Sequence, residues 1–284
     1  MKIYDRKNNI LEIENQYKEN TLKFLYNNVL GRILLNLIFA RPWFNKLISI
    51  YHKSSFSKKD IIPFIKKYKI NTINDTKNQF SNFNDFFIRK KYIKYIVNEK
   101  DLISVADSKL LAYPIVDDLK LKIKGSDYSL EEILNNKQEA KFYKNGYCLI
   151  FRLTMDDNHR YIFPDFGKYL KQYHIKGTLH TIRPISSKYK AFKRNSRTIS
   201  ILECRELGRV AQIEVGAMLV GHIVNHNLLT FNKLQEKGYF EYGGSTIILL
   251  LKNNIKIDED ILYNTKNEIE TKVEMGEKIG EILC

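Results

Sequence analysis

A serine that follows two glycines is the residue whose setting could support chemistry. Residues 241–246 (EYGGST) lead directly into IILLLK, a run apolar enough to form a buried strand. Glycine permits backbone conformations that other residues cannot adopt, so the Gly-Gly pair could present a strained peptide bond to the hydroxyl of Ser245. Local sequence alone favours the simpler interpretation, a turn or bulge at the mouth of the strand.

Histidines and cysteines provide further candidates. The six histidines are His52, His159, His174, His180, His222 and His226. No pair has the HExxH spacing and no cysteine or carboxylate set completes a ligand cluster, so we expect no metal. The three cysteines form no CxxC pair, which disfavours zinc and a disulfide framework and fits a reducing compartment. The phosphate-binding motifs GxxxxGK[ST] and GxGxxG and the GxSxG nucleophile motif are also missing from the sequence.

The charge of the chain predicts a partner that carries negative charge. Lys and Arg number 47 against 32 Asp and Glu, which gives a net charge of +15. The lysines are spread along the whole chain, which disfavours nucleic acid as the partner. An anionic membrane surface, where each Lys or Arg contributes roughly 1 kcal/mol, is the other candidate. A solvated charged face is the simplest interpretation of any single cluster.

The elements that must position these residues begin with a helix. Apolar residues recur at spacings of three and four over residues 20–51, with a break or kink at Pro42. The uncharged part, residues 33–40, lies between Arg32 and Arg41 and is far shorter than the roughly 20 residues that span a bilayer. This helix could lie in a membrane interface or pack on the core, and the sequence leaves both possibilities open.

A short helix is expected at residues 56–70, and an aromatic helix or turn is expected at residues 80–91. Beyond Leu102, runs rich in Ile, Val, Tyr and Thr alternate with Gly, Asp and Asn, as is typical of strands. A helix over residues 129–143, with a capping box at its start, interrupts them.

This texture predicts an α+β fold in two parts. A helical, membrane-associating N-terminal part covers residues 1–100, and a larger, mainly antiparallel β domain covers residues 101–284. We expect the chemistry to lie in the second part.

Five motifs in chain order resemble the phosphatidylserine decarboxylase family, in particular its shorter bacterial proenzymes. They are FNDFFIRK, VADSKLLAYP, LTMDDNHRYIFPDFG, AQIEVGAMLVGHI and KGYFEYGGSTIILLLKN, and they run from Phe83 toward the C-terminus. The most specific element is EVGA-x-x-VG-x-I followed about twenty residues later by KG-x-F-x-x-GGST.

The resemblance implies self-cleavage between Gly244 and Ser245. In the family the serine hydroxyl attacks the preceding carbonyl, the ester undergoes β-elimination, and loss of ammonia leaves an N-terminal pyruvoyl group. Residues 1–244 and 245–284 would be the two chains, with the cofactor made from Ser245. The pyruvoyl ketone then serves as an electron sink while phosphatidylserine becomes phosphatidylethanolamine and carbon dioxide.

The resemblance also implies an Asp-His-Ser triad. Asp107, in VADSKLLAY, matches the family aspartate, although Ser108 stands where the family has glycine. His159 matches the first of two family histidines, and Ile162 stands at the second. Ile162 cannot transfer a proton.

Three explanations for Ile162 remain open at this point. The resemblance implies that the second family histidine belongs to the triad and that the first protonates or positions the substrate. Either His159 has both roles, or another histidine such as His180 or His222 has moved into place, or the chain is a diverged and inactive relative.

The sequence therefore predicts a self-processing decarboxylase at the cytoplasmic face of the cell membrane, with phosphatidylserine and the anionic surface as partners and a homodimer as the family tendency. The alternatives are a diverged homologue that binds anionic lipid without cleaving, and a basic nucleic-acid-binding protein. We expect no nucleic acid as partner.

Overall fold

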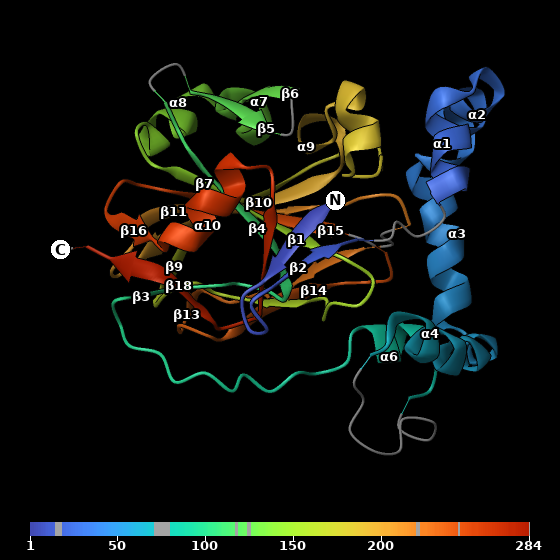
Figure 1. The fold of residues 1–284 in the computed structure, drawn as a ribbon, viewed down its shortest axis with the longest axis horizontal. Coiled ribbons are helices and arrows are strands. Elements are labelled where there is room, and N and C mark those ends of the chain that lie inside the picture. The colour runs from blue at the N-terminus through green and yellow to red at the C-terminus, as the bar shows by residue number, and fades with distance from the viewer. Residues whose placement is uncertain are drawn as a thin grey trace.

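Helices dominate the N-terminal third of the chain and strands dominate the remainder (Figure 1). The computed structural model describes residues 1–14, 19–70, 80–116, 119–123, 126–219, 222–243 and 245–283. Gly244, which the sequence places at the cleavage site, lies outside the described residues.

The helical elements in chain order are α1 (Glu19–Asn27), α2 (Val29–Leu34), the π-helix η1 (Leu35–Phe39), α3 (Pro42–Lys53), the 3₁₀-helix η2 (Ser55–Asp60), α4 (Ile61–Tyr68), α6 (Phe83–Phe87), α7 (Leu130–Leu134), α8 (Lys137–Ala140), the 3₁₀-helices η3 (Lys141–Tyr143) and η4 (Pro184–Tyr189), α9 (Ala191–Arg194) and α10 (Glu259–Lys266). The strands are β1 (Lys2–Asp5), β2 (Ile10–Ile13), β3 (Asp101–Ile103), β4 (Ser108–Pro114), β5 (Lys120–Ile123), β6 (Ser126–Ser129), β7 (Tyr147–Leu153), β8 (Arg160–Ile162), β9 (Gly167–Ile175), β10 (Arg197–Cys204), β11 (Gly208–Val215), β12 (Ile223–Asn225), β13 (Thr230–Phe231), β14 (Glu236–Phe240), β15 (Ser245–Leu251), β16 (Ile255–Ile257), β17 (Glu270–Val273) and β18 (Lys278–Ile282).

A ten-stranded sheet forms the centre of the β domain, in the order β13-β9-β10-β11-β15-β7-β4-β17-β1-β2. Its pairs are antiparallel except for β1 with β17. Strand β15 is buried along its whole length. Its successive side chains point to opposite faces of the sheet, and both faces are covered by a hydrophobic cluster. Ile247 and Leu249 join the hydrophobic cluster on one face, and Ile248 and Leu250 join the cluster on the other. The predicted α+β class is confirmed.

Two expectations need correction. Residues 1–13, expected within the helical part, hold strands β1 and β2 at the edge of the large sheet. The single helix expected over residues 129–143 is three short helices, because Asn135 ends α7 in the left-handed conformation. Of the expected capping box only one half forms: the backbone N–H of Ser129 donates to Glu132, and the Ser129 side chain makes no capping bond.

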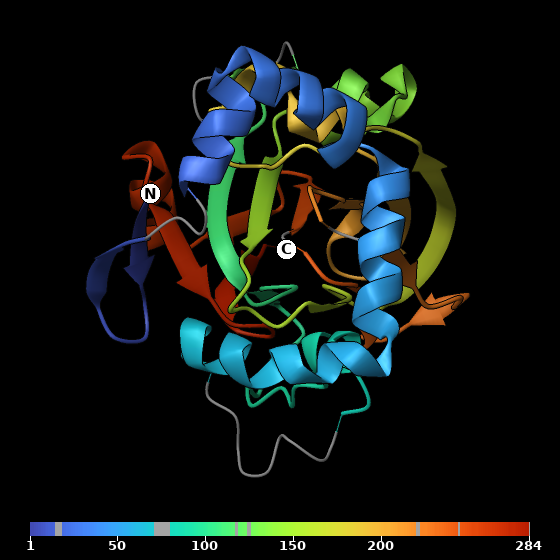
Figure 2. The ribbon, with the colours of Figure 1, turned by 90° about the vertical axis from the view of Figure 1, so that its right-hand side faces the viewer.

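The N-terminal helices stand at one end of the large sheet, with α1 and α2 above, α3 vertical and α4 with α6 below (Figures 1 and 2). The expected break occurs at Pro42, which is the first residue of α3, where a missing backbone N–H costs nothing. A second break occurs at Asn28, whose side chain caps α2.

No single helix in the described ranges is long and apolar enough to cross a bilayer. The segments Val29–Phe39 and Pro42–Lys53 pass that test only as a pair, and they are bent by 67°.

Candidate active site

Ser245 opens strand β15, in the middle of the large sheet. It pairs with Leu153 of β7, while its neighbour Thr246 pairs with Val215 of β11. The side chain is only 2% exposed, and its Oγ has no hydrogen-bond partner in the described part of the chain. An unpaired buried hydroxyl costs about 1–3 kcal/mol, so this position invites a functional explanation.

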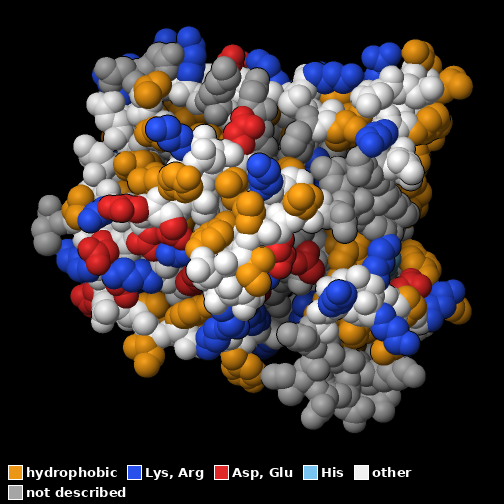
Figure 3. Space-filling model, viewed as in Figure 1, with side chains coloured by type: hydrophobic (Ala, Val, Ile, Leu, Met, Phe, Trp, Pro, Cys, Tyr) orange, Lys and Arg blue, Asp and Glu red, His pale blue; other side chains and the backbone are white. Residues whose placement is uncertain are grey.

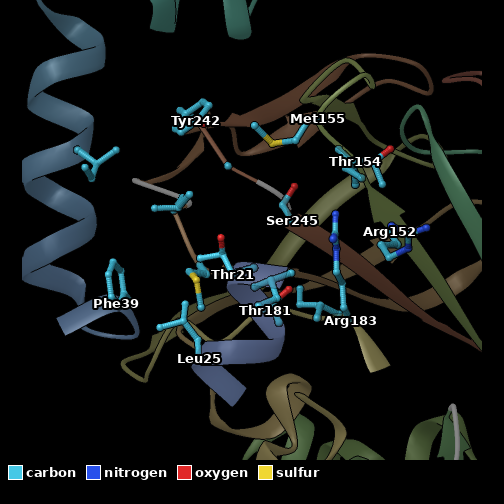
Figure 4. Close-up of a pocket in the computed structure, with 18 of the residues that line it drawn as sticks. Thr21, Leu25, Phe39, Arg152, Thr154, Met155, Thr181, Arg183, Tyr242 and Ser245 are labelled. Carbon is cyan, nitrogen blue, oxygen red and sulfur yellow. The ribbon is translucent and has the colours of Figure 1, made fainter. Parts of the chain in front are cut away.

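A cavity of about 410 Å³ lies against Ser245 (Figure 4). Tyr242 lies on one side of the serine, and Arg152 and Arg183 lie on the other (Figure 4). The N-terminal helices and the β domain both line the cavity, with Thr21, Leu22, Leu25, Phe39, Phe44, Ile48 and His52 from the helices and Arg152, Leu153, Thr154, Met155, Thr181, Ile182, Arg183, Ala217, Met218, Leu219, Tyr242, Gly243 and Ser245 from the β domain. Its walls are mostly apolar, as in sites that take a hydrophobic ligand with a few polar groups.

Helix α3 is fastened to the segment that precedes the serine. Lys53 forms an ion pair with the buried carboxylate of Glu241 at 2.7 Å, and Ser49 Oγ donates to the same carboxylate at 3.4 Å. The helix that lines the cavity is therefore held directly against residues 241–243.

His159 is fully buried in the turn between β7 and β8. Its Nδ1 lies 3.1 Å from the carbonyl oxygen of Asp157, and its ring packs on Phe87 with centroids 4.1 Å apart. A carbonyl can only accept, so Nδ1 carries the proton and Nε2 keeps its lone pair. Nε2 makes no hydrogen bond of good geometry to a described residue, although the Gly243 backbone lies close enough to favour the protonated ring.

Burial, with a smaller contribution from the nearby Arg89 guanidinium, lowers the pKa of His159 to about 3. The imidazole is therefore neutral at physiological pH. A neutral imidazole with a free nitrogen is suited to act as a general base.

A buried ion pair fixes the turn that holds His159. Lys109 Nζ lies 2.8 Å from both carboxylate oxygens of Asp157, and Thr154 N–H donates to the same carboxylate at 2.7 Å. Asn158 donates to the Arg89 carbonyl oxygen at 2.9 Å. The FNDFFIRK and DNHR motifs of the sequence are thus in direct contact.

Asp107 lies in the loop between β3 and β4. Its carboxylate accepts from Lys91 Nζ at 2.7 and 2.8 Å and from the Met275 N–H at 2.8 Å. It makes no hydrogen bond with His159, so the expected triad is not joined by hydrogen bonds. Arg89 connects the two electrostatically: burial lowers the pKa of its guanidinium, and the negative charge of Asp107 opposes that shift.

Ile162 and the two histidines considered as its replacement, His180 and His222, lie elsewhere. Ile162 is a buried core residue of β8. His180 lies 3.4 Å from Tyr26 Oη and stacks on Tyr189, and burial lowers its pKa to about 4. His222 is exposed. None of them lines the cavity beside Ser245.

The most specific motif pair of the sequence meets in one buried ion pair. Glu214 of EVGA and Lys237 of KGYF lie 2.8 Å apart, and both side chains are completely buried. Lys237 also donates to Asn225 Oδ1 at 3.0 Å. Breaking such a pair by removing one partner costs about 3–5 kcal/mol, so the motif fixes the strands on which residues 241–245 depend.

Unpartnered polar atoms gather around the serine. Seven buried side-chain atoms in the described ranges lack a hydrogen-bond partner. Three of them belong to Ser245, to His52 at the same cavity and to His159 beside the Gly243 backbone, so unpaired groups are found where a reaction would need them free.

The chain was compared with known proteins. The phosphatidylserine decarboxylase family model matches residues 83–281. The chain is 51% identical to phosphatidylserine decarboxylase proenzyme 2 of Clostridium acetobutylicum, over 98% of each chain. It is 40% identical to the phosphatidylserine decarboxylase proenzyme of Clostridium novyi over 99% of each chain, and 37% identical to that of Desulfitobacterium hafniense over 99% of this chain and 98% of the relative.

With the fold and the buried serine, these matches define the class of the chain as a pyruvoyl-forming proenzyme. More particularly, the chain belongs to the phosphatidylserine decarboxylase family and is a carboxy-lyase. The predicted family, activity and cofactor are confirmed.

Several residues at this site were not predicted from the sequence. Lys91, Arg89 and Lys109 lie in a chain rich in dispersed Lys and Arg, where a single basic residue carries no signal. Lys91 stands in the FIRKK run sixteen residues before its partner Asp107. His52 was named only as one of six histidine candidates, because the sequence suggested membrane contact or packing for the helix that carries it.

Proposed function

We propose that the chain cleaves itself between Gly244 and Ser245, and that Ser245 becomes the pyruvoyl group of the smaller chain. The processed enzyme then converts phosphatidylserine to phosphatidylethanolamine and carbon dioxide. The buried, unpartnered Ser245 hydroxyl at the wall of an apolar cavity carries this proposal. No described residue makes a hydrogen bond to the Ser245 side chain, so this position suits a pyruvoyl group. Such a group would supply an electron sink for the substrate amine.

His159 is the base in this proposal. Its free Nε2 takes the proton of Ser245 Oγ as the oxygen attacks the carbonyl carbon of Gly244. Asp107 acts on His159 through Arg89, because its negative charge offsets the guanidinium that would otherwise make the imidazole a weaker base. A long or unformed hydrogen bond before reaction is compatible with these roles, since catalytic contacts often tighten only during the reaction.

The N-terminal helices support a peripheral membrane location at the cytoplasmic side. Exposed apolar side chains gather on α2, η1 and α3, and Lys and Arg lie among them along this edge of the molecule (Figure 3). The exposed apolar residues are Val29, Leu30, Ile33, Leu34, Leu37, Trp43, Leu47 and Ile50, and the basic ones are Arg32, Arg41 and Lys46. Apolar burial together with attraction to anionic lipid is the usual basis of such binding. Because other side chains of the same helices line the cavity, docking would bring the lipid substrate to Ser245.

The purified wild-type chain tests the proposed processing. We expect fragments of residues 1–244 and 245–284 by intact mass, with the smaller one blocked to Edman degradation and shifted by ketone-trapping reagents. Added vesicles of phosphatidylserine should then yield phosphatidylethanolamine. A chain that stays full length after prolonged incubation would favour the diverged, non-processing relative. The native mass of the same sample tests the proposed homodimer.

A double substitution on the outer face of α3 tests the membrane location. Trp43 and Leu47 are 52% and 56% exposed, so serine at both positions should preserve the fold. Each lost apolar contact is worth about 1.5–3 kcal/mol when fully buried in lipid, so we expect flotation with phosphatidylserine vesicles to weaken at least about tenfold. Leu229→Ser, an 88% exposed leucine of the β domain, is the matched control and should float normally. Unchanged flotation of the double variant would contradict the proposal.

Point substitutions are the appropriate design here. Removing residues 1–52 would also delete β1 and β2 from the large sheet, so loss of binding by that truncation would not identify the helices as the cause.

A further inference from the structure

His52 lies at the cavity beside Ser245, although it comes from the N-terminal helix α3. Its ring packs on Tyr242 with centroids 4.0 Å apart and on Phe83 with centroids 4.9 Å apart. Its carbonyl oxygen accepts a hydrogen bond from Ser57 Oγ at 2.9 Å, and Ser57 Oγ in turn accepts from the Phe83 N–H at 3.0 Å. The position of His52 is thus fixed from three elements.

The imidazole of His52 is incompletely satisfied. Its Nδ1 is buried without a hydrogen-bond partner among the described residues. Burial lowers the pKa of the ring, and Asp60 opposes that shift. Arg152 and Arg183 are the basic side chains that line the same cavity. A bound substrate that brings a carboxylate and a phosphate would favour the protonated imidazole.

Decarboxylation needs a proton at this cavity. The bond between the serine Cα of the lipid head group and its carboxyl carbon breaks, carbon dioxide leaves, and the remaining electron pair must take up a proton at that Cα. Among the described residues that line the cavity, His52 is the only side chain of a type that titrates near neutral pH. His159 is not among them.

We propose that His52 is the proton donor of decarboxylation, a role that rests on the function proposed above. It is a catalytic residue of the second reaction and has no part in the cleavage that creates the cofactor. Two histidines from different ends of the chain thus divide the two reactions, with His159 serving cleavage.

Two substitutions separate proton transfer from packing. His52→Phe keeps an aromatic ring against Tyr242 and Phe83, and His52→Gln keeps a hydrogen-bonding side chain. His180→Gln, at a buried histidine outside the cavity, is the matched control. We expect all three variants to self-cleave, and both His52 variants to lose about 100-fold or more in kcat with a smaller change in KM. The control should retain wild-type kcat.

The N-terminus of the smaller chain gives a second readout. Without a donor at the correct carbon, the proton is added instead to the carbon that was the pyruvoyl ketone. Hydrolysis then leaves the substrate nitrogen on the protein as an N-terminal alanine and releases the lipid as an aldehyde. Edman degradation after turnover should therefore read alanine in the His52 variants, while the wild-type chain stays blocked.

Three results would overturn this inference. They are wild-type kcat in both His52 variants with blocked small chains, recovery of kcat by glutamine but not by phenylalanine, and loss of self-cleavage in both. A wild-type enzyme that cleaves but does not decarboxylate would instead count against the proposed function, so the two failures are distinguishable.

Discussion

Ser245→Ala is expected to leave only the full-length chain. Alanine has no nucleophile, so the ester that begins cleavage cannot form. The replaced Oγ has no hydrogen-bond partner, so its removal breaks no bond and relieves the cost of an unpaired buried hydroxyl; the free energy of unfolding should not fall and should rise by up to about 1–3 kcal/mol. Intact mass over a prolonged incubation measures the cleavage, and urea unfolding verifies the fold.

Thr246→Val is the matched control for that substitution. Thr246 is the next residue of β15, and its buried hydroxyl is also unpartnered, but it points to the opposite face of the strand. We expect this variant to cleave like the wild type. Cleavage in Ser245→Ala would sink the proposed mechanism. Loss of cleavage in Thr246→Val would mean that any change at the start of the strand disturbs the site.

His159→Gln should slow self-cleavage by about 10²–10⁴-fold. Glutamine can still donate a hydrogen bond to the Asp157 carbonyl, but it cannot accept the proton of Ser245. His180→Gln, at another buried histidine with a lowered pKa, should cleave at the wild-type rate. A wild-type rate in His159→Gln would assign the base to another group.

The pH dependence of cleavage provides an independent test of His159. Its pKa of about 3 keeps Nε2 unprotonated, so the cleavage rate should stay level from pH 8 down to about pH 5. A rate that falls through the ordinary histidine value of 6.5 would instead identify a solvated imidazole as the base.

The stability of the fold, unlike the cleavage rate, should depend on pH in this range. Below pH 6.5 the unfolded chain binds a proton at His159 that the folded chain takes up only near pH 3. The free energy of unfolding of Ser245→Ala should therefore decrease as the pH falls through this window, by up to about 1.4 kcal/mol per pH unit from this group.

The parts of the fold written in local patterns could be predicted from the sequence. The apolar run after Ser245 predicted a buried strand, and Pro42 predicted a helix break. Both features depend on neighbours along the chain, where periodicity and backbone restrictions act directly. The same reasoning failed at Asn135, since a single left-handed residue within a helical pattern has a weak signature.

The parts that depend on distant partners could not be predicted. The motif match identified Ser245, His159 and Asp107, yet it could not show that Lys91 and the Met275 amide hold the aspartate. Nor could it bring His52 to the serine, because that proximity arises from the docking of α3 through Glu241. Such contacts are decided by tertiary packing, on which local propensity has no bearing.

The central position of β15 affects what becomes of the enzyme once it is cut. After cleavage at the proposed bond, the smaller chain contributes β15, β16, β17, β18 and α10, and β15 stays paired with β11 and β7 of the larger chain. The precursor can refold as one molecule, whereas the two chains must find each other again at a rate that depends on concentration. Cleavage thus converts a chain that can refold into a complex of two chains. The time for which that complex stays active depends on its rate of unfolding, that is, on its kinetic stability.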